Sequence, residues 1–164
     1  MNKIKNKTSR TFLFSLLIVL TIILTACGST PNVDWELSVS GAVSNPTVFT
    51  YKELADLPQV DLKDVLMEKS RGEDEFRSFS GVKLSLILEE VGAQDNLSSI
   101  TAQAADGYAI EVSTDELVDG IVALKDGNDW IVNSDPKSGP IRLVFPATPA
   151  NRWVFQLTEI IVNP

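Results

Sequence analysis

The sequence contains a single cysteine, Cys27, and no histidine among its 164 residues. One thiol cannot form an intramolecular disulfide. The absence of histidine removes the commonest general base and the commonest metal ligand. The sequence also has no glycine-rich loop of the kind that cradles a nucleotide phosphate. Composition alone therefore excludes much of the usual catalytic chemistry.

Basic residues are also scarce. The chain has 14 Lys and Arg residues against 22 Asp and Glu. Four of the basic residues, Lys3, Lys5, Lys7 and Arg10, lie in the first ten positions, so the rest of the chain has 10 against 22 and a net charge of about −12. Such a surface repels nucleic acid and anionic lipid headgroups. We therefore expect no nucleic-acid partner, and the charge helps to keep a domain soluble close to a membrane.

The N-terminal segment has the pattern of an export signal. The four basic residues precede an apolar run over residues 12–24 that only Ser15 and Thr21 interrupt. A basic region followed by an apolar region is typical of a secretory signal. The alternative is one membrane-spanning anchor with an incidental cysteine. The run is shorter than the ~20 residues that cross a bilayer, which favours the signal.

The signal ends in Leu24-Thr25-Ala26-Cys27, which resembles a bacterial lipobox. The resemblance implies removal of the preceding peptide and acylation of the Cys27 thiol. We predict a signal peptide over residues 1–26, a lipidated cysteine and tether over residues 27–33, and a folded domain over residues 34–164. The lipid would hold that domain on the cell membrane or envelope surface, outside the cytoplasm. The mature chain would then have no free thiol for a metal or a nucleophilic reaction.

Hydrophobic periodicity over residues 34–164 indicates many short strands with few helices. Capping-box patterns start predicted helices at Thr50 and Ser113, and glycines end predicted helices at Gly92 and Gly120. The expected helices cover residues 50–58, 84–91 and 113–120, and the charged residues 68–77 are expected to form an exposed loop or hairpin tip. Strands are expected near residues 35–39, 60–67, 99–104, 108–112, 121–124, 141–145 and 153–162. This pattern predicts an α+β or mainly β domain.

Six phrases, in order, resemble the molybdopterin-binding domain of the sulfite oxidase family. They are residues 35–46, residues 50–58, residues 81–88, Asp106-Gly107-Tyr108, residues 139–146 and residues 152–160. The resemblance covers nearly the whole domain. It implies an α+β fold with mixed β-sheets and short helices, in which loops hold a pterin cofactor.

The sequence departs from the catalytic members of this family at two places. Where the family has a molybdenum-ligating cysteine, residues 65–71 contain none, and the neutral thioether of Met67 cannot replace an anionic sulfur. Where the family has a lysine that helps to hold the pterin phosphate, ungapped counting gives Phe155. Arg152 keeps a positive charge nearby, and Arg142 matches the family's strand arginine. Arg142 is also consistent with a carboxylate-paired structural role.

Other patterns suggest weaker hypotheses. Asp126-Gly127-Asn128-Asp129 has the oxygen ligands of a calcium loop, but it lacks the following glutamate and equally indicates a hairpin turn. The three tryptophans suit either a core or a ligand groove. If a ligand pocket persists, we predict that it involves Arg71, Tyr108, Arg142, Arg152 and Trp153.

The favoured hypothesis is a lipid-anchored, non-catalytic binding or interaction module whose small-molecule or protein partner the sequence does not identify. No catalytic residue or metal ligand is predicted. The alternative is a molybdopterin-dependent oxidoreductase, or a subunit of a redox complex, that retains the pterin without a protein thiolate. Molybdopterin is therefore a cofactor only by resemblance, because the residue that would bind molybdenum is missing.

Overall fold

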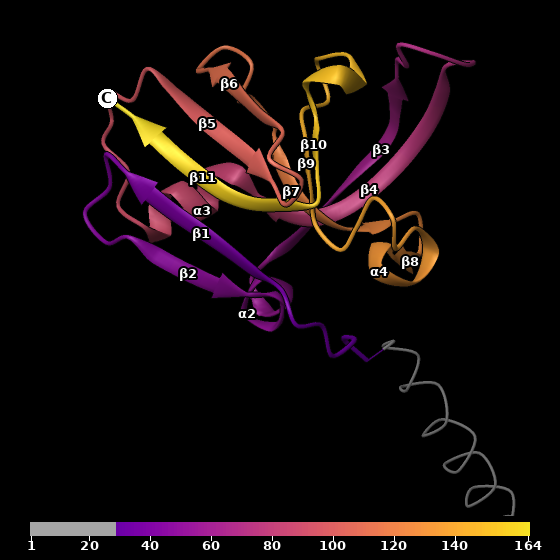
Figure 1. Cartoon of the computed structure of the whole chain (residues 1–164), viewed down its shortest axis with the longest axis horizontal. Helices are drawn as coiled ribbons and strands as arrows, with labels where there is room; N and C mark the ends of the chain where they lie inside the picture. Colours follow the sequence, from indigo (N-terminus) through magenta and orange to yellow (C-terminus); the bar gives the residue numbers. More distant parts are fainter. Residues whose placement is uncertain (1–28) are drawn as a thin grey trace, which may run out of the picture. The chain divides into compact units, whose positions relative to one another are not determined.

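The computed structural model describes residues 29–164. The predicted signal peptide and Cys27 lie outside the described residues. Within the described part, no helix has the length and apolar character needed to span a bilayer. Two β-sheets with short helices make up the domain, as the α+β prediction requires (Figure 1).

The first sheet has five strands in the order β2-β1-β11-β5-β6. The C-terminal strand β11 pairs in parallel with β1, whereas every other pair in this sheet is antiparallel. The first and last strands of the domain therefore lie side by side (Figure 1). The bounds are β1 Glu36–Gly41, β2 Thr47–Thr50, β5 Ser99–Ala104, β6 Ala109–Ser113 and β11 Leu157–Asn163.

The second sheet is antiparallel and has the order β10-β9-β7-β4-β3, with β8 paired to β7. Its two longest strands form the β3–β4 hairpin, which extends away from the rest of the domain in Figure 1. The bounds are β3 Gln59–Met67, β4 Glu75–Lys83, β7 Ile121–Asp126, β8 Asp129–Trp130, β9 Arg142–Val144 and β10 Val154–Phe155.

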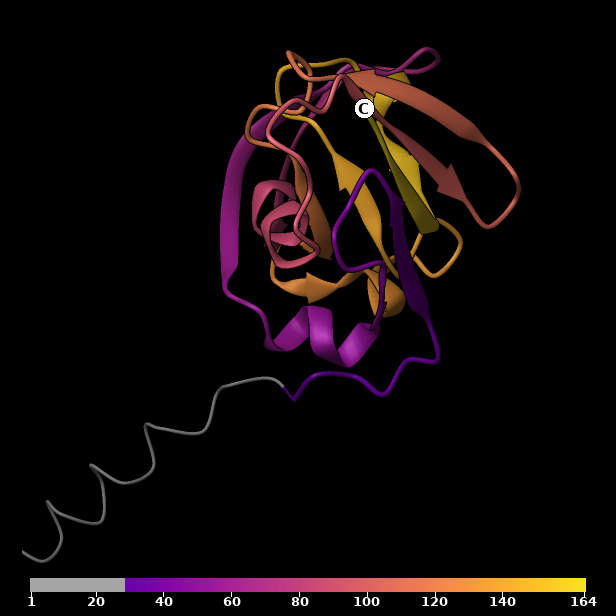
Figure 2. The same ribbon diagram turned by 90° about the vertical axis from the view of Figure 1, so that its left-hand side faces the viewer.

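Short helices connect these strands. Helix α2 spans Tyr51–Asp56 and begins at the predicted capping box, in which Thr50 and Glu53 bond each other's backbone amides. Helix α3 spans Leu84–Glu90, buries its apolar face and contacts β4. Figure 2 shows the two helices α2 and α3 from a second direction. Both predicted helices are confirmed. The other helical segments are α4, Ile131–Ser134, and the 3₁₀ turn η1, Ala150–Arg152.

The buried core follows the expected periodicity. Leu37 and Val39 alternate with more exposed residues along β1, as in a strand with one covered face. In β7, by contrast, all of residues 121–124 are buried, because this strand lies inside the second sheet. Gly81 permits a close approach there, since a Cβ atom would lie 2.1 Å from the Val122 carbonyl oxygen.

The helix predicted over residues 113–120 is wrong. The Ser113 amide does donate to the Glu116 carboxylate, at 3.2 Å, but Ser113 ends β6 and the following residues form turns rather than a helix. Glu116 is also bound by Arg152, and Asp119 has a left-handed φ of 56° just before Gly120. A left-handed residue interrupts helical geometry, so the local capping signal initiates no helix.

The predicted loop over residues 68–77 is correct only in part. The loop itself is short, and β4 begins at Glu75 and continues to Lys83. The sequence prediction missed this strand because charged residues occupy its start. Those charges lie on a projecting hairpin, where one strand edge and much of both faces meet solvent.

A sharp corner carries the chain from the second sheet to the first. Gln156 lies between β10 and β11 and has a left-handed φ of 50°. Its carbonyl accepts a hydrogen bond from the Ala105 amide at 2.9 Å, and its side-chain amide donates to the Lys137 carbonyl. These bonds fix the corner beside the β5–β6 turn and bring residues 150–156 close to residues 104–108.

Candidate functional site

Arg142, on β9, lies at the centre of a buried ionic cluster and is only 1% exposed. Its Nη1 donates to Asp126 Oδ2 at 3.2 Å, and its Nη2 donates to Asp135 Oδ2 at 2.7 Å. Its Nε donates to the Ser138 carbonyl at 3.3 Å. The two carboxylates come from the end of β7 and from the residue after α4. Each of the three guanidinium nitrogens therefore already has a partner within the chain.

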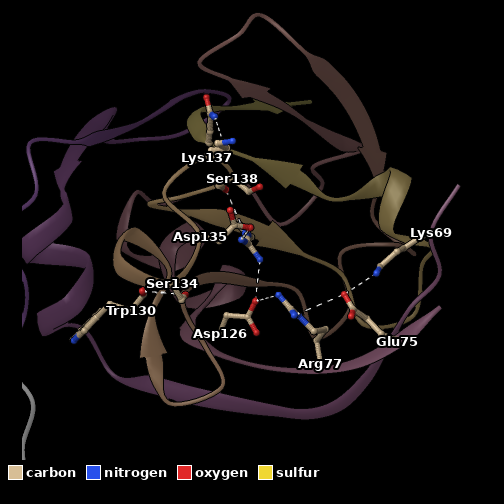
Figure 3. Close-up of polar contacts among 11 residues, drawn as sticks. Lys69, Glu75, Arg77, Asp126, Trp130, Ser134, Asp135, Lys137 and Ser138 are labelled. Atoms are coloured by element: carbon tan, nitrogen blue, oxygen red, sulfur yellow. Dashed lines mark hydrogen bonds and ion pairs between the residues drawn. The ribbon is translucent and has the colours of Figure 1, made fainter. Parts of the chain in front are cut away.

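The cluster continues along the β3–β4 hairpin, as Figure 3 shows. Asp126 also accepts a hydrogen bond from Arg77 on β4. Arg77 lies 3.8 Å from Glu75, which is paired with Lys69 at 2.9 Å. Positive and negative groups thus alternate from the hairpin tip to the interior. The Lys69 hydrogen bond holds the pKa of Glu75 below its usual range, which keeps this carboxylate ionised.

The aromatic ring of Phe155 covers the same arginine. The Arg142 guanidinium carbon lies 5.1 Å from the Phe155 ring centroid, within the range of a cation–π contact. Burial lowers the pKa of Arg142, while the charges of Asp126 and Asp135 act in the opposite direction. An arginine stays protonated in proteins, so the cluster contains a charged guanidinium neutralised from two sides.

Arg152, at the end of η1, forms a second and more exposed ion pair. Its Nε and Nη2 each donate to a different oxygen of Glu116 at 2.8 Å, and Nη2 also reaches the Glu111 carbonyl at 2.8 Å. This fork geometry is the strong form of an arginine–carboxylate contact. The Arg152 hydrogen bond, followed by that of the Ser113 amide, lowers the pKa of Glu116 to about 2. The pairing in turn raises the pKa of Arg152.

A pocket of about 290 Å³ opens beside these two clusters. Tyr108, Trp153 and Phe155 supply aromatic walls. Ala104 and Ala150 leave space between them, and Asp106 and Asn151 supply the polar part of the lining. The Tyr108 hydroxyl donates to the Asn151 carbonyl at 3.0 Å, which links the β5–β6 turn to η1.

The structure brings most of the predicted pocket residues into one region. Tyr108 and Trp153 line the pocket, while Arg152 and Arg142 lie in the ion pairs beside it. Arg71 is exposed in the hairpin loop, away from the pocket lining. That loop does reach η1, because the Ala150 amide donates to the Glu68 carbonyl at 3.0 Å. The ligand-binding role of all five residues stays a prediction.

Sequence reasoning missed the acidic partners. The sequence pattern suggests a turn or a calcium loop for Asp126, whereas in the structure this carboxylate accepts from two arginines. Within residues 29–164 no three His, Cys, Asp or Glu side chains are grouped as a metal site would require. A buried arginine implies nearby acceptors, but nothing local in the sequence indicates which acids provide them.

The mixed five-stranded sheet, the antiparallel second sheet and the short helices between them form a fold that is also found in a protein of known structure. A structural comparison finds this fold in the sulfane dehydrogenase SoxCD from Paracoccus pantotrophus, with a TM-score of 0.72 and 21% identity over 83% of this chain. The match covers 40% of that chain, so this protein spans less than half of its length. No curated protein matches the sequence.

The family model for the oxidoreductase molybdopterin binding domain matches residues 27–164, and the chain belongs to this family. Its architecture is the sulfite-oxidase-type molybdopterin-binding fold, with mixed β-sheets and short helices. The fold predicted from the sequence is thereby confirmed.

The two arginines considered for the cofactor of this family do not fit its phosphate. A pterin phosphate needs unpaired cationic donors, whereas Arg142 and Arg152 both hold carboxylates at hydrogen-bond distance. The described residues contain no cysteine or histidine to ligate a metal. Asp126 and Asp135 would also repel a phosphate dianion near Arg142.

Proposed function

We propose that this protein is a lipid-anchored, extracytoplasmic binding module that uses the molybdopterin-binding fold without metal chemistry. The observation that supports this most is the internal neutralisation of both candidate anion-binding arginines. Arg142 has two carboxylates within 3.2 Å, and Arg152 has one carboxylate bound through two nitrogens. An anionic cofactor would have to displace these carboxylates to bind either arginine.

The available metal donors support the same proposal. High-valent molybdenum in this family is held by a soft anionic sulfur, as the sequence resemblance implies. Cys27 is the only cysteine, and the lipobox pattern assigns its thiol to acylation. Met67, at the end of β3, offers only a neutral thioether. No other side chain in the sequence supplies an anionic sulfur.

The lipid anchor rests on the pattern of residues 1–27. Acyl chains on Cys27 would hold the domain at the outer face of a membrane, with a tether of a few residues before β1. The net charge of about −12 in the mature part would keep the domain away from anionic headgroups while the lipid prevents its release.

Mass and cofactor measurements on the full chain, expressed in a bacterial host and extracted in a neutral detergent, test both parts of the proposal. We expect substoichiometric molybdenum and tungsten, and no fluorescent pterin oxidation product after denaturation. Intact-mass spectrometry should show loss of residues 1–26 and added acyl mass on Cys27. The Cys27→Ser variant is the matched control and should remain unprocessed and unacylated. Stoichiometric metal would refute the non-catalytic role, and an unacylated Cys27 would refute the anchor.

The alternative function is a molybdopterin-dependent oxidoreductase or a subunit of a redox complex. Family membership is the observation that favours it. It predicts that a pterin co-purifies in stoichiometric amount, so the same preparation distinguishes the two proposals.

A further inference from the structure

We propose that the pocket beside Tyr108 binds a small organic cation, with an ammonium group held between the Asp106 carboxylate and the aromatic walls. This inference deepens the proposed function, because it names the ligand class of the binding module. Its basis is the chemistry of the pocket lining and of the groups beside it.

The walls of the pocket are aromatic. Tyr108 spans the gap between the β5–β6 turn and η1, fixed by its hydroxyl bond to Asn151. The indole NH of the almost fully buried Trp153 already donates to the Phe145 carbonyl at 3.0 Å, so this polar atom is not free for a ligand. The Phe155 ring already contacts the Arg142 guanidinium, so the exposed ring of Tyr108 provides the main π face for a ligand cation.

Asp106 is the only carboxylate among the described residues that line this pocket. Its Oδ1 accepts from the Tyr108 amide at 2.9 Å, which fixes the carboxylate at the turn. Among residues 29–164, no lysine or arginine forms an ion pair with it. Gly107 stabilises this geometry, because its φ of 87° suits a residue without a side chain. The carboxylate is therefore oriented and available to a cationic ligand.

The arginine beside this site is not available to an anionic ligand. Arg152 is bound by Glu116 through two nitrogens and by the Glu111 carbonyl. A ligand anion would have to displace Glu116 and would also face Asp106. A ligand cation needs no displacement, and the net negative charge of the domain raises its local concentration.

The size of the pocket limits the ligand to a small one. A volume of about 290 Å³ is at the low end for ligand sites. A quaternary or primary ammonium on a short apolar chain matches this space and the aromatic lining. Because Tyr108 is 45% exposed, the site is open to solvent and the affinity should be modest.

Choline is a suitable probe, and 3,3-dimethylbutan-1-ol is its neutral isostere. Ligand-observed NMR titration of the full acylated chain in maltoside micelles should give saturable choline binding, with a dissociation constant on the order of 1 mM. The alcohol should bind at least about tenfold more weakly, since it has the same shape without the charge. Inorganic phosphate should not bind.

Two variants locate the site. Asp106→Asn keeps the oxygen that accepts from the Tyr108 amide but removes the charge, and it should weaken choline binding about tenfold. Tyr108→Leu keeps an apolar wall without a π face and should weaken it about fivefold. The matched control is Asp61→Asn on β3, which removes an exposed carboxylate outside this pocket and should leave binding unchanged. Far-UV circular dichroism checks that each variant is folded.

Equal binding of choline and the alcohol, binding of phosphate, or absence of saturable binding would overturn the cation site. Unchanged binding in the folded Asp106→Asn variant would overturn it as well. Metal and pterin content measured on the same preparation keeps the two proposals separate. A preparation free of pterin and metal that does not bind choline refutes only the cation site, whereas stoichiometric pterin or metal refutes the proposed function.

Discussion

The two arginine sites of this domain differ in burial, although each is neutralised by acids of the same chain. Arg142 is 1% exposed and serves as a junction between β9, the end of β7 and the residue after α4. Arg152 joins η1 to the turn after β6, and about a third of its side chain is exposed. The Arg142–Asp126 pair lies inside the domain, whereas Asp135 and the Arg152–Glu116 pair reach its surface.

This difference determines what each pair contributes. A buried ion pair adds little net stability compared with an apolar replacement, but loss of one partner leaves a buried uncompensated charge. A surface pair loses less, because water solvates the remaining charge. Loss of Arg142 should therefore lower the stability of the whole domain. Loss of the Arg152 pair should mainly loosen the turn beside the pocket.

The largest expected effect comes from Arg142→Met. This change removes a buried guanidinium and leaves Asp126, whose side chain is only 12% exposed, with Arg77 alone. Asp135 also loses its partner, but its side chain is 38% exposed and water can solvate it. We expect the free energy of unfolding to fall by about 3 kcal/mol, measured by urea denaturation. Arg152→Met is the matched control, with an expected loss of about 0.5–1 kcal/mol. Equal losses in the two variants would contradict the assignment of only one arginine to the core.

A smaller effect is expected at Phe155, whose ring contacts Arg142. Phe155→Leu keeps an apolar side chain but removes the π face, and we expect a loss of about 1–2 kcal/mol in unfolding free energy. A double-mutant cycle with Arg142→Met isolates the cation–π part, which should be about 0.5–1 kcal/mol. Strict additivity of the two substitutions would show that the ring stabilises the domain through packing alone.

The smallest effect concerns pH and the exposed pair. The pKa of Glu116 is lowered in the folded state to about 2, mainly by Arg152 and then by the Ser113 amide. A depressed carboxyl pKa contributes stability above the unfolded-state pKa, and this contribution disappears as pH falls toward 2. Glu116→Gln should therefore flatten the loss of stability between about pH 5 and pH 2.

Urea denaturation at several pH values checks this slope, and Arg152→Met should flatten it in the same way. Glu53→Gln is a useful comparison, since the Thr50 backbone amide rather than an arginine lowers the pKa of Glu53. If neither Glu116→Gln nor Arg152→Met changed the slope, the surface pair would have no measurable role in the folded state.

Sequence patterns predicted those parts of the fold that depend on neighbours in the chain. The box at Thr50 forms as expected, because both of its hydrogen bonds join residues three apart. The same pattern at Ser113 also forms its hydrogen bond to Glu116, yet no helix follows, because Asp119 has a left-handed φ of 56° just before Gly120. The sequence also does not predict strand β4, because its pairing with β3 and β7 defines the strand and its own composition does not.

The candidate site likewise combines features that the sequence indicates with contacts that only the fold creates. The sequence indicates Tyr108 and Trp153 as candidate pocket residues, and the structure places both in one pocket lining. In the sequence, Phe155 stands out only as a departure from the family's lysine, and Asp106 only as part of a turn. Their proximity depends on the corner at Gln156, whose left-handed backbone no sequence pattern indicates for a glutamine.

The amino-acid sequence alone determined which chemical groups exist: one thiol, no imidazole, and more than twice as many acids as bases once the N-terminal basic residues are set aside. It also determined the local turns, caps and amphipathic faces, because these depend on residues a few positions apart. Only the tertiary structure decided that Asp126 and Asp135 neutralise Arg142 and that Glu116 neutralises Arg152. The physical reason is that an ion pair depends on distances in space, and sheet pairing sets those distances between segments far apart in the chain.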